Sequence, residues 1–249
     1  MSSNMYAFLL SSIAGFSTLI GFLFIFIKKD REGVISRALG FASGVMLTIS
    51  IIDLIPNSLD LIINEYKFIY ALFFVLFGFL IGIIVSSIID KKVENSSKNN
   101  SKLYKLGIIT MLVIILHNIP EGIATYITST NNIKLGITLT IAIALHNIPE
   151  GISISIPIYY STKSKLKAFT YTLISGISEP IGALIAYLFL SKVVGDVSLA
   201  ILYSIIAGMM TNISINELYK ESINYNKKNT IIYFFIGSLI MLFNHLLFN

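Results

Sequence analysis

The chain has 249 residues, of which 55% are hydrophobic and 12% are charged, and it carries a formal net charge of +5. Soluble domains carry about 25% charged residues, so this composition excludes an ordinary soluble protein and predicts an integral membrane protein. The absence of cysteine excludes disulfides and thiolate metal sites. The basic residues follow the pattern of a membrane protein, and we therefore expect the lipid bilayer as a partner and no nucleic acid.

Eight apolar segments, each about long enough to cross a bilayer as a helix, follow one another along the chain. They predict an all-α membrane protein of eight transmembrane helices that forms a single domain over residues 1–249. The predicted segments cover residues 5–27, 34–58, 68–89, 104–127, 135–159, 167–190, 198–219 and 230–248. The longest hydrophilic stretch, about 90–105, predicts a flexible cytoplasmic linker.

The basic residues alternate between the predicted connections. The odd-numbered connections and their flanks carry 15 of the 18 lysines and arginines, and the even-numbered connections carry 3. Connections rich in lysine and arginine stay on the cytoplasmic side, so both termini are predicted to face outward. The fourth and fifth segments then cross the membrane in opposite directions.

One heptapeptide occurs twice in these two segments. Leu-His-Asn-Ile-Pro-Glu-Gly begins at Leu116 and again, 29 residues later, at Leu145. Each copy lies about halfway along its segment, where ionisable groups are costly and usually mark the pathway of a substrate or ion. Because the segments are antiparallel, the copies predict an inverted repeat with a site near the membrane midplane, as in secondary transporters.

Each copy places a His and a Glu four residues apart, and therefore on one face of a helix, with an Asn next to the His. The residues are His117, Asn118 and Glu121 in the first copy and His146, Asn147 and Glu150 in the second. Two such faces offer two imidazoles, two carboxylates and two amides, which suit a divalent metal such as zinc, iron or manganese. The repetition favours this interpretation over a network of interhelical hydrogen bonds.

The motif also contains a proline and a glycine. Pro120 has no N–H group, so the carbonyl of Leu116 loses its usual partner and the helix is expected to kink or loosen there. Gly122 has no side chain and is expected to let another helix or an ion come close. The same expectations apply to Pro149 and Gly151.

Four further polar residues lie in the predicted spans. Glu179 precedes Pro180 about halfway through the sixth segment and repeats the motif's association of a carboxylate with a proline, which predicts a place on the pathway. Asp53 and Glu217 lie nearer the ends of their segments, where a solvated acid and a role along the path are equally consistent. His245 has no carboxylate one turn away and is expected to be structural or interfacial.

The two copies of the motif resemble the ZIP (Zrt/Irt-like) family of metal transporters, in its bacterial branch. The resemblance covers essentially the whole chain and includes Gly44-Val45-Met46 and the stretch 176–184. It implies an inverted-repeat bundle of eight helices with both termini outside. It also implies uptake of divalent transition metals across the bacterial cytoplasmic membrane, with zinc first and iron, manganese, cobalt and cadmium as further substrates. The metal is then transported cargo, and no cofactor is expected.

The resemblance also implies roles for particular residues. The implied ligands of the main site are His117, Glu121, His146 and Glu150, with Met46 reaching them from the second segment. An adjacent second site would use Asn118, Asn147 and Glu179 and share the two glutamates. Residues 90–105 lack the histidines that many members carry in this connection. Formation of a homodimer is left open.

An intramembrane zinc-dependent hydrolase is the alternative function. Zinc hydrolases also place His and Glu on helices, as in H-E-x-x-H, where the Glu is the general base. Here the order is His-Asn-x-Pro-Glu without a second His four residues on, and a symmetric site suits a permeating ion better than a polarised substrate. We therefore expect no enzymatic activity. A carrier and a gated channel would use the same ligands, and both stay open, as does coupling to protons.

Overall fold

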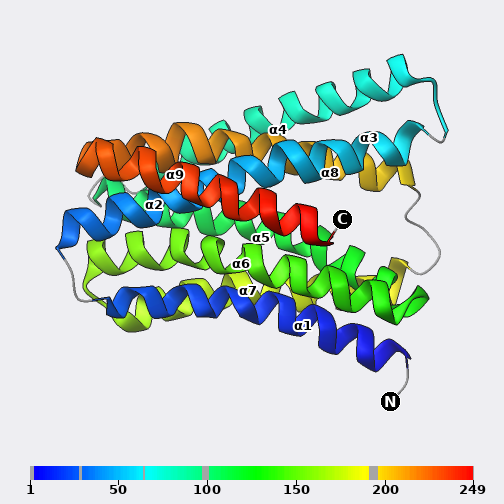
Figure 1. Ribbon diagram of the computed structural model, residues 1–249, viewed down its shortest axis with the longest axis horizontal. Coiled ribbons are helices and arrows are strands. Elements are labelled where there is room, and N and C mark those ends of the chain that lie inside the picture. The colour runs from blue at the N-terminus through cyan, green and yellow to red at the C-terminus, as the bar shows by residue number, and fades with distance from the viewer. Residues whose placement is uncertain (1–2, 28–29, 64, 97–100, 191–195, 249) are drawn as a thin grey trace.

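Helices account for the architecture of the residues that the computed structural model describes, which are 3–27, 30–63, 65–96, 101–190 and 196–248 (Figure 1). Short 3₁₀ and π-helical turns, named η, extend or join some of them. The elements are α1 (Ser3–Phe22), η1 (Leu23–Phe26), α2 (Arg31–Ile49), η2 (Ser50–Leu54), α3 (Ile55–Ile63), α4 (Phe68–Ser96), α5 (Lys102–Asn131), α6 (Ile133–Thr162), α7 (Lys165–Ile185), η3 (Ala186–Leu190), α8 (Asp196–Asn212), η4 (Ile213–Tyr219) and α9 (Lys220–Phe248).

Polar side chains cap four of the helices where the connections enter them. Each accepts a hydrogen bond from a backbone N–H group of the first turn, which has no partner within the helix. The capping residues are Asp30 of α2, Ser101 of α5, Asn132 of α6 and Ser164 of α7. With these caps the polar ends remain helical, and α5 and α6 reach 30 residues each, beyond the apolar segments predicted for them.

Seven helical stretches in the described residues are long and apolar enough to cross a membrane. The first six coincide with the first six predicted segments. The seventh, Val197–Phe248, has 52 residues and contains both the seventh and the eighth predicted segments. Within it the backbone is extended at Asn226, whose side chain accepts a hydrogen bond from Asn229 N at 2.9 Å and so begins the next helix. The chain is an all-helical membrane protein.

The linker predicted over residues 90–105 is largely helical. α4 continues to Ser96 and α5 begins at Lys102, while residues 97–100 lie outside the described part of the chain. Ile89 and Val93 of α4 pack against the hydrophobic core, which favours helix beyond the apolar segment. The predicted linker was therefore too long at both ends.

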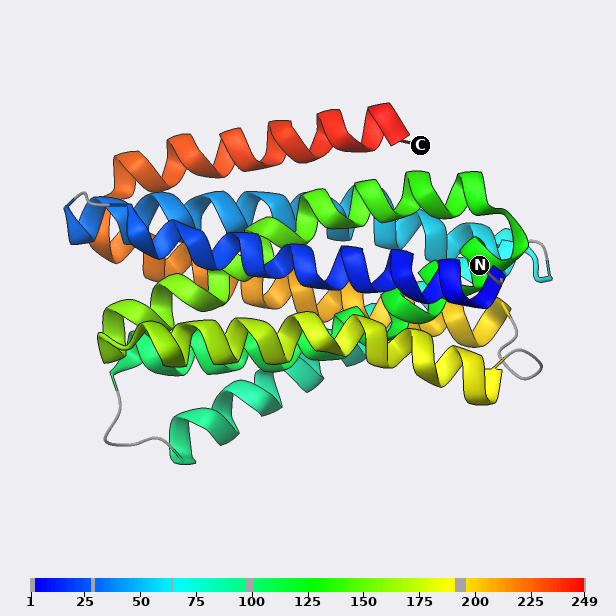
Figure 2. The same ribbon diagram turned by 90° about the horizontal axis from the view of Figure 1, so that it is seen from below.

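The helices divide into two groups. In the first, named here the α5 group, α1, α5, α6 and α7 pack on one another. In the second, the α2 group, α2 packs along α9 while α8 packs against α3 and α4. Figures 1 and 2 show the elongated bundle that the two groups form. α6 contacts α2 and α9 across the boundary between the groups, and α5 contacts α4 and α8.

The two motif glycines join α5 and α6 closely to their neighbours. Gly122 lies against the backbone oxygen of Glu179 in α7, and Gly151 against that of Thr18 in α1. A Cβ atom at either position would overlap that oxygen. The predicted close approach of helices is therefore confirmed, and it holds the motif helices inside the α5 group.

Irregular helical turns occur away from the motif prolines. α5 and α6 continue as α-helix through Pro120 and Pro149, so neither proline interrupts its helix. The π-helical turns are η2, η3 and η4. Such turns are frequent at functional sites. η2 carries Asp53 and η4 carries Glu217, the two acids for which the sequence left two interpretations open.

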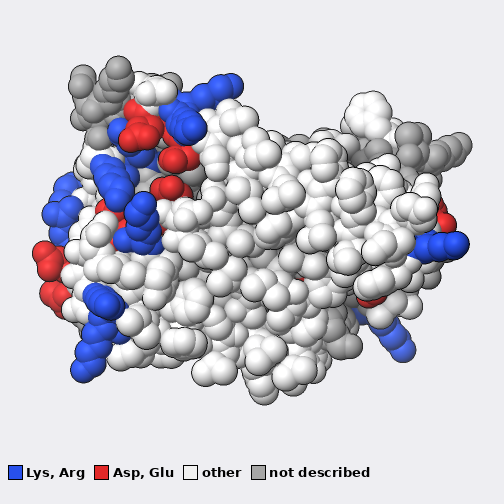
Figure 3. Space-filling model, turned by 90° about the horizontal axis from the view of Figure 1, so that it is seen from above, with Lys and Arg blue, Asp and Glu red and all other residues white. Residues whose placement is uncertain are grey.

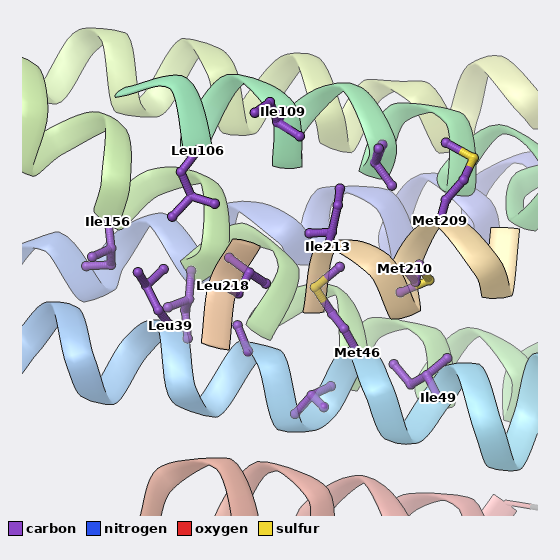
Figure 4. Packing of buried hydrophobic residues seen from close by; sticks show 14 of the residues in the cluster. Leu39, Met46, Ile49, Leu106, Ile109, Ile156, Met209, Met210, Ile213 and Leu218 are labelled. Atoms are coloured by element: carbon purple, nitrogen blue, oxygen red, sulfur yellow. The ribbon is translucent and has the colours of Figure 1, made fainter. Parts of the chain in front are cut away.

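A hydrophobic cluster fills the space between the two groups (Figure 4). It draws on α2, α5, α6, α8 and η4. The residues labelled in the figure are Leu39, Met46, Ile49, Leu106, Ile109, Ile156, Met209, Met210, Ile213 and Leu218. Leu106 and Ile109 lie two to three turns before His117 on α5, on the side where Lys102 begins the helix. The cluster thus packs the bundle between the motif and this end, named here the Lys-rich end.

Candidate metal centre

The two copies of the motif meet in the middle of the bundle. Because only Asn132 separates α5 from α6, the two helices run antiparallel, and each places its motif about halfway along its length. His117, His146 and Glu150 are 2%, 3% and 0% exposed. These groups are therefore almost completely removed from solvent.

Two histidines and two glutamates converge there. His146 Nε2 lies 2.8 Å from Glu121 Oε1, while His117 Nε2 lies 3.5 Å from Glu121 Oε2 and 3.6 Å from Glu150 Oε1. The centroids of the two imidazole rings are 6.3 Å apart. Glu121 thus lies between the two histidines, and His117 between the two glutamates. The fold thus brings together the two helix faces that carry the motif, as predicted.

Several buried polar atoms of these four side chains have no hydrogen-bond partner among the described residues. They are both ring nitrogens of His117, Oε2 of Glu121, Nδ1 of His146 and both carboxylate oxygens of Glu150. Buried polar atoms are normally paired, and buried charges are paired or bind metal. Two ligands held tetrahedrally at about 2.0–2.1 Å from zinc are about 3.3–3.4 Å apart, close to the 3.5 and 3.6 Å separations here. The arrangement can bind a divalent metal ion.

A second group of polar side chains lies beside the first. Asn147 Nδ2 donates to Glu179 Oε2 at 2.9 Å and to the backbone oxygen of Ala14 at 2.9 Å. Asn118 Nδ2 donates to the backbone oxygen of Ser175 at 3.3 Å. Both amide oxygens and Glu179 Oε1 are buried without a hydrogen-bond partner in the described structure. The fold thus brings Asn147 and Glu179 together, as the resemblance implied, and leaves three oxygens able to accept.

Met46 occupies a different environment. It is 0% exposed and belongs to the hydrophobic cluster, where Figure 4 shows it among aliphatic side chains such as Ile213. It is not among the residues that line the cavity described next. Its role as a metal ligand stays a prediction, and its present contacts are those of a core residue.

A cavity of about 400 Å³ leads from the centre toward the end of the bundle opposite the Lys-rich end. His117, Glu121 and His146 line its inner part. Farther out it is lined by Asp53 and by His245 of α9. The sequence analysis did not predict that His245 faces this cavity, because no local pattern reports that the last helix packs against η2.

Glu217 lies elsewhere, at the Lys-rich end. It lines a separate cavity of about 340 Å³ together with Asp90, Glu94 and several lysines. Nearby, Lys102 of α5 and Glu221 of α9 form an ion pair of 2.7 Å that crosses between the two groups. Glu217 therefore lies apart from the histidines, which line the other cavity, and next to charged neighbours of both signs.

The central geometry fits a known family. Residues 90–245 match the family described as ZIP zinc transporter. This match takes in more than half of the chain and both copies of the motif.

The chain belongs to the ZIP zinc transporter family. Relatives of similar length agree with this assignment. The chain is 37% identical over 263 residues to the zinc transporter ZupT of Streptococcus mutans, and the alignment covers 100% of both proteins. It is 38% identical over 272 residues to that of Campylobacter jejuni, covering 95% of this chain and 94% of the relative. It is 36% identical over 271 residues to the zinc transporter ZupT of Clostridium perfringens, covering 97% of this chain and 95% of the relative.

Membership of the ZIP family confirms the resemblance that the sequence analysis stated. The family is one of transporters, so the alternative of an intramembrane hydrolase is rejected. The fold agrees, since the chain is a multi-pass membrane protein with a buried group of His117, Glu121 and His146 whose ligand atoms all lie within 4.8 Å of one another.

Proposed function

We propose that this protein is a secondary transporter that carries zinc across the bacterial cytoplasmic membrane into the cytoplasm. The convergence of His117, Glu121, His146 and Glu150 on an antiparallel helix pair carries the proposal. Membership of the ZIP family and relatives that are named zinc transporters support it.

The ligand chemistry supports zinc and similar ions. Two ionised glutamates supply two negative charges, which balance a divalent cation where its hydration shell is lost. Imidazole nitrogens favour borderline metals such as zinc and iron over magnesium and calcium, which prefer oxygen ligands. Manganese, cobalt and cadmium are further substrates in this proposal. Without a thiolate the site binds its ion moderately, and this allows the ion to leave again.

The amide side chains beside the centre form part of a second metal-binding site in this proposal. Asn118, Asn147 and Glu179 hold a metal ion next to the first position and share Glu121 and Glu150 with it. Three of their oxygen atoms are buried without a hydrogen-bond partner in the described structure, which suits this role. Met46 reaches the first position only after a change in the packing of α2.

Eight membrane crossings with both termini outside complete the topology that we propose. The stretch Val197–Phe248 has 52 residues and would measure about 78 Å as one helix, more than twice the hydrocarbon thickness of about 30 Å. The extended backbone at Asn226 lies between the seventh and eighth predicted segments, which supports two crossings. Figure 3 shows the lysines and arginines of one face gathered mainly at one end, which the positive-inside rule places in the cytoplasm.

Alternating access through relative movement of the two groups fits this arrangement. All the proposed ligands except Met46 lie on α5, α6 and α7, and glycines join helices within each group through backbone contacts, as Gly122 does in the α5 group and Gly44 in the α2 group. Between the groups lie the aliphatic side chains of the hydrophobic cluster, which can slide more easily than interlocked backbones. The cavity reaches the ligands from the outer end, so the described conformation corresponds to an outward-facing state.

Zinc flux into proteoliposomes tests the proposal. We expect saturable flux with the wild-type protein and at least about a hundredfold loss in Glu121→Ala/Glu150→Ala, because both charges that balance the ion are removed. Adding iron, manganese, cobalt or cadmium in turn as competitor sets the substrate order. The matched control is Glu32→Ala/Glu65→Ala, which makes the same change at two exposed glutamates.

Equal flux in the folded Glu121→Ala/Glu150→Ala variant and the wild type would mean that the motif is structural. Loss of flux in the control as well as in the motif variant would also contradict the assignment, because the effect would then not depend on the buried pair.

A further inference from the structure

The outer part of the cavity is lined by polar side chains to which the proposed transport pathway assigns no role. Asp53 and Asn57 line it from η2 and α3, and Asn244 and His245 line it from the last turns of α9. Figure 1 shows that α9 stops short of the end of the bundle where α1 begins, and α9 contacts α6. The outer mouth is therefore built from segments that are almost 200 residues apart in the sequence.

Asn244 is the most informative of these residues. It is 5% exposed, although it lies four residues before Phe248 at the end of the described chain. Its Nδ2 donates to the backbone oxygen of Ala142 at 3.3 Å, which orients the amide. Its Oδ1 is buried and has no hydrogen-bond partner in the part of the chain that the structure describes. The amide oxygen of Asn244, in the cavity wall, can therefore accept a hydrogen bond or bind a metal ion.

Asp53 supplies the negative charge of this region. It lies in the π-helical turn η2 and is half-buried, and Asn57 Nδ2 donates to its Oδ1 at 2.8 Å. α9 packs against η2, which brings the carboxylate and the end of α9 to the same cavity. π-helical turns are frequent at functional sites because they change which side chains face a neighbour.

His245 adds a nitrogen ligand beside the amide. An imidazole nitrogen, a carboxylate oxygen and an amide oxygen form a set that zinc and similar ions accept, with water completing the coordination. Only one of the three carries a negative charge, against two in the central group. Such a set holds a metal ion more weakly than the centre does.

We propose that Asp53, Asn244 and His245 form an outer site that captures a divalent transition metal ion before it reaches His117 and Glu121. The proposal rests on the transport function proposed above. All three residues belong to the α2 group, whereas the central histidines and glutamates belong to the α5 group. These three side chains therefore stay with the α2 group when the α5 group moves with its ion, while the hydrogen bond from Asn244 to Ala142 of α6 breaks. The outer site can then bind the next metal ion.

Metal binding tests the outer site independently of transport. In the Glu121→Ala/Glu150→Ala background, zinc titration by calorimetry is expected to show one residual weak site. Adding either His245→Ala or Asp53→Asn is expected to weaken that binding at least about tenfold. The control is Leu246→Ala in the same background, because Leu246 is 72% exposed and does not line the cavity. Residual binding that is absent, or that neither substitution changes, overturns the proposal.

Flux measurements with an otherwise intact centre give the second readout. His245→Ala and Asn244→Ser are each expected to raise the zinc concentration for half-maximal flux about tenfold and to leave the maximal flux unchanged. A fall in maximal flux at an unchanged half-maximal concentration contradicts capture. Failure of the proposed transport function can be distinguished from failure of the outer site. It appears as undiminished flux in Glu121→Ala/Glu150→Ala, whatever the outer substitutions do.

Discussion

At the scale of single residues, Glu121 and Glu150 have unequal places in the central group. Glu121 contacts both histidines, through Oε1 at 2.8 Å and Oε2 at 3.5 Å. Of the two histidines, only His117 forms a close pair with Glu150 among the described residues, at 3.6 Å, and both carboxylate oxygens of Glu150 lack hydrogen bonds there. Sequence symmetry between the two copies of the motif therefore does not extend to their contacts.

This asymmetry predicts unequal effects of two isosteric substitutions. Glu121→Gln is expected to weaken zinc binding more than Glu150→Gln, because it removes the charge between both histidines, and each is expected to cost at least about tenfold in affinity. Calorimetric titration in detergent measures both. Glu65→Gln is the control, since Glu65 is exposed in the connection after α3. Equal affinities for all three variants would contradict the assignment of the centre.

At the scale of elements, the backbone contact between α5 and α7 holds the central helix pair in place. Gly122 lies directly on the backbone oxygen of Glu179, so an added methyl group meets atoms that cannot rotate away. Gly107, earlier on α5, faces the side chain of Ile158, whose flexible end can shift. The two glycines share one helix and differ in what surrounds them.

We expect Gly122→Ala to destabilise the protein by about 1–3 kcal/mol through overpacking. Gly107→Ala is expected to change stability much less, because the helical preference of alanine, about 1 kcal/mol over glycine, offsets the displacement of Ile158. Thermal unfolding in detergent compares the two variants with the wild type. Similar midpoints for both variants would show that α5 and α7 are not in the close contact described.

At the scale of the whole molecule, charge and helix length together set the topology. The charged residues of the Lys-rich end include the ion pair between Lys102 and Glu221, which links α5 to α9 there. The opposite end carries few basic residues, among them Lys67 and Lys134. A protein inserted with the Lys-rich end in the cytoplasm presents the central cavity to the outside.

The absence of native cysteine makes this topology directly testable. In intact cells, a membrane-impermeant maleimide is expected to label Lys67→Cys and Lys134→Cys, and to label Lys163→Cys and Lys227→Cys only after lysis. All four positions are exposed. The cysteine-free parent is the control for background. Labelling of Lys227→Cys in intact cells would contradict the division of Val197–Phe248 into two crossings.

Local features of the sequence were enough to predict much of the fold. The length of the apolar segments predicted the helices, because crossing a bilayer sets a minimum length for each one. The linker predicted over 90–105 from its polarity is largely helical, because Ile89 and Val93 hold α4 against the core. The kink or loosening expected at Pro120 stays a prediction, since α5 continues as one helix through this residue.

The sequence by itself determined the membrane class, the repeated motif, its mid-span depth and the family, because hydrophobic length and the spacing of residues along a helix are local properties. Only the tertiary structure decided which side chains meet. It joined His146 to Glu121 across two helices, placed Met46 in the hydrophobic cluster, and brought Asn244 and His245 to the outer cavity. These outcomes depend on how helices distant in sequence pack against one another, and no local pattern encodes that packing.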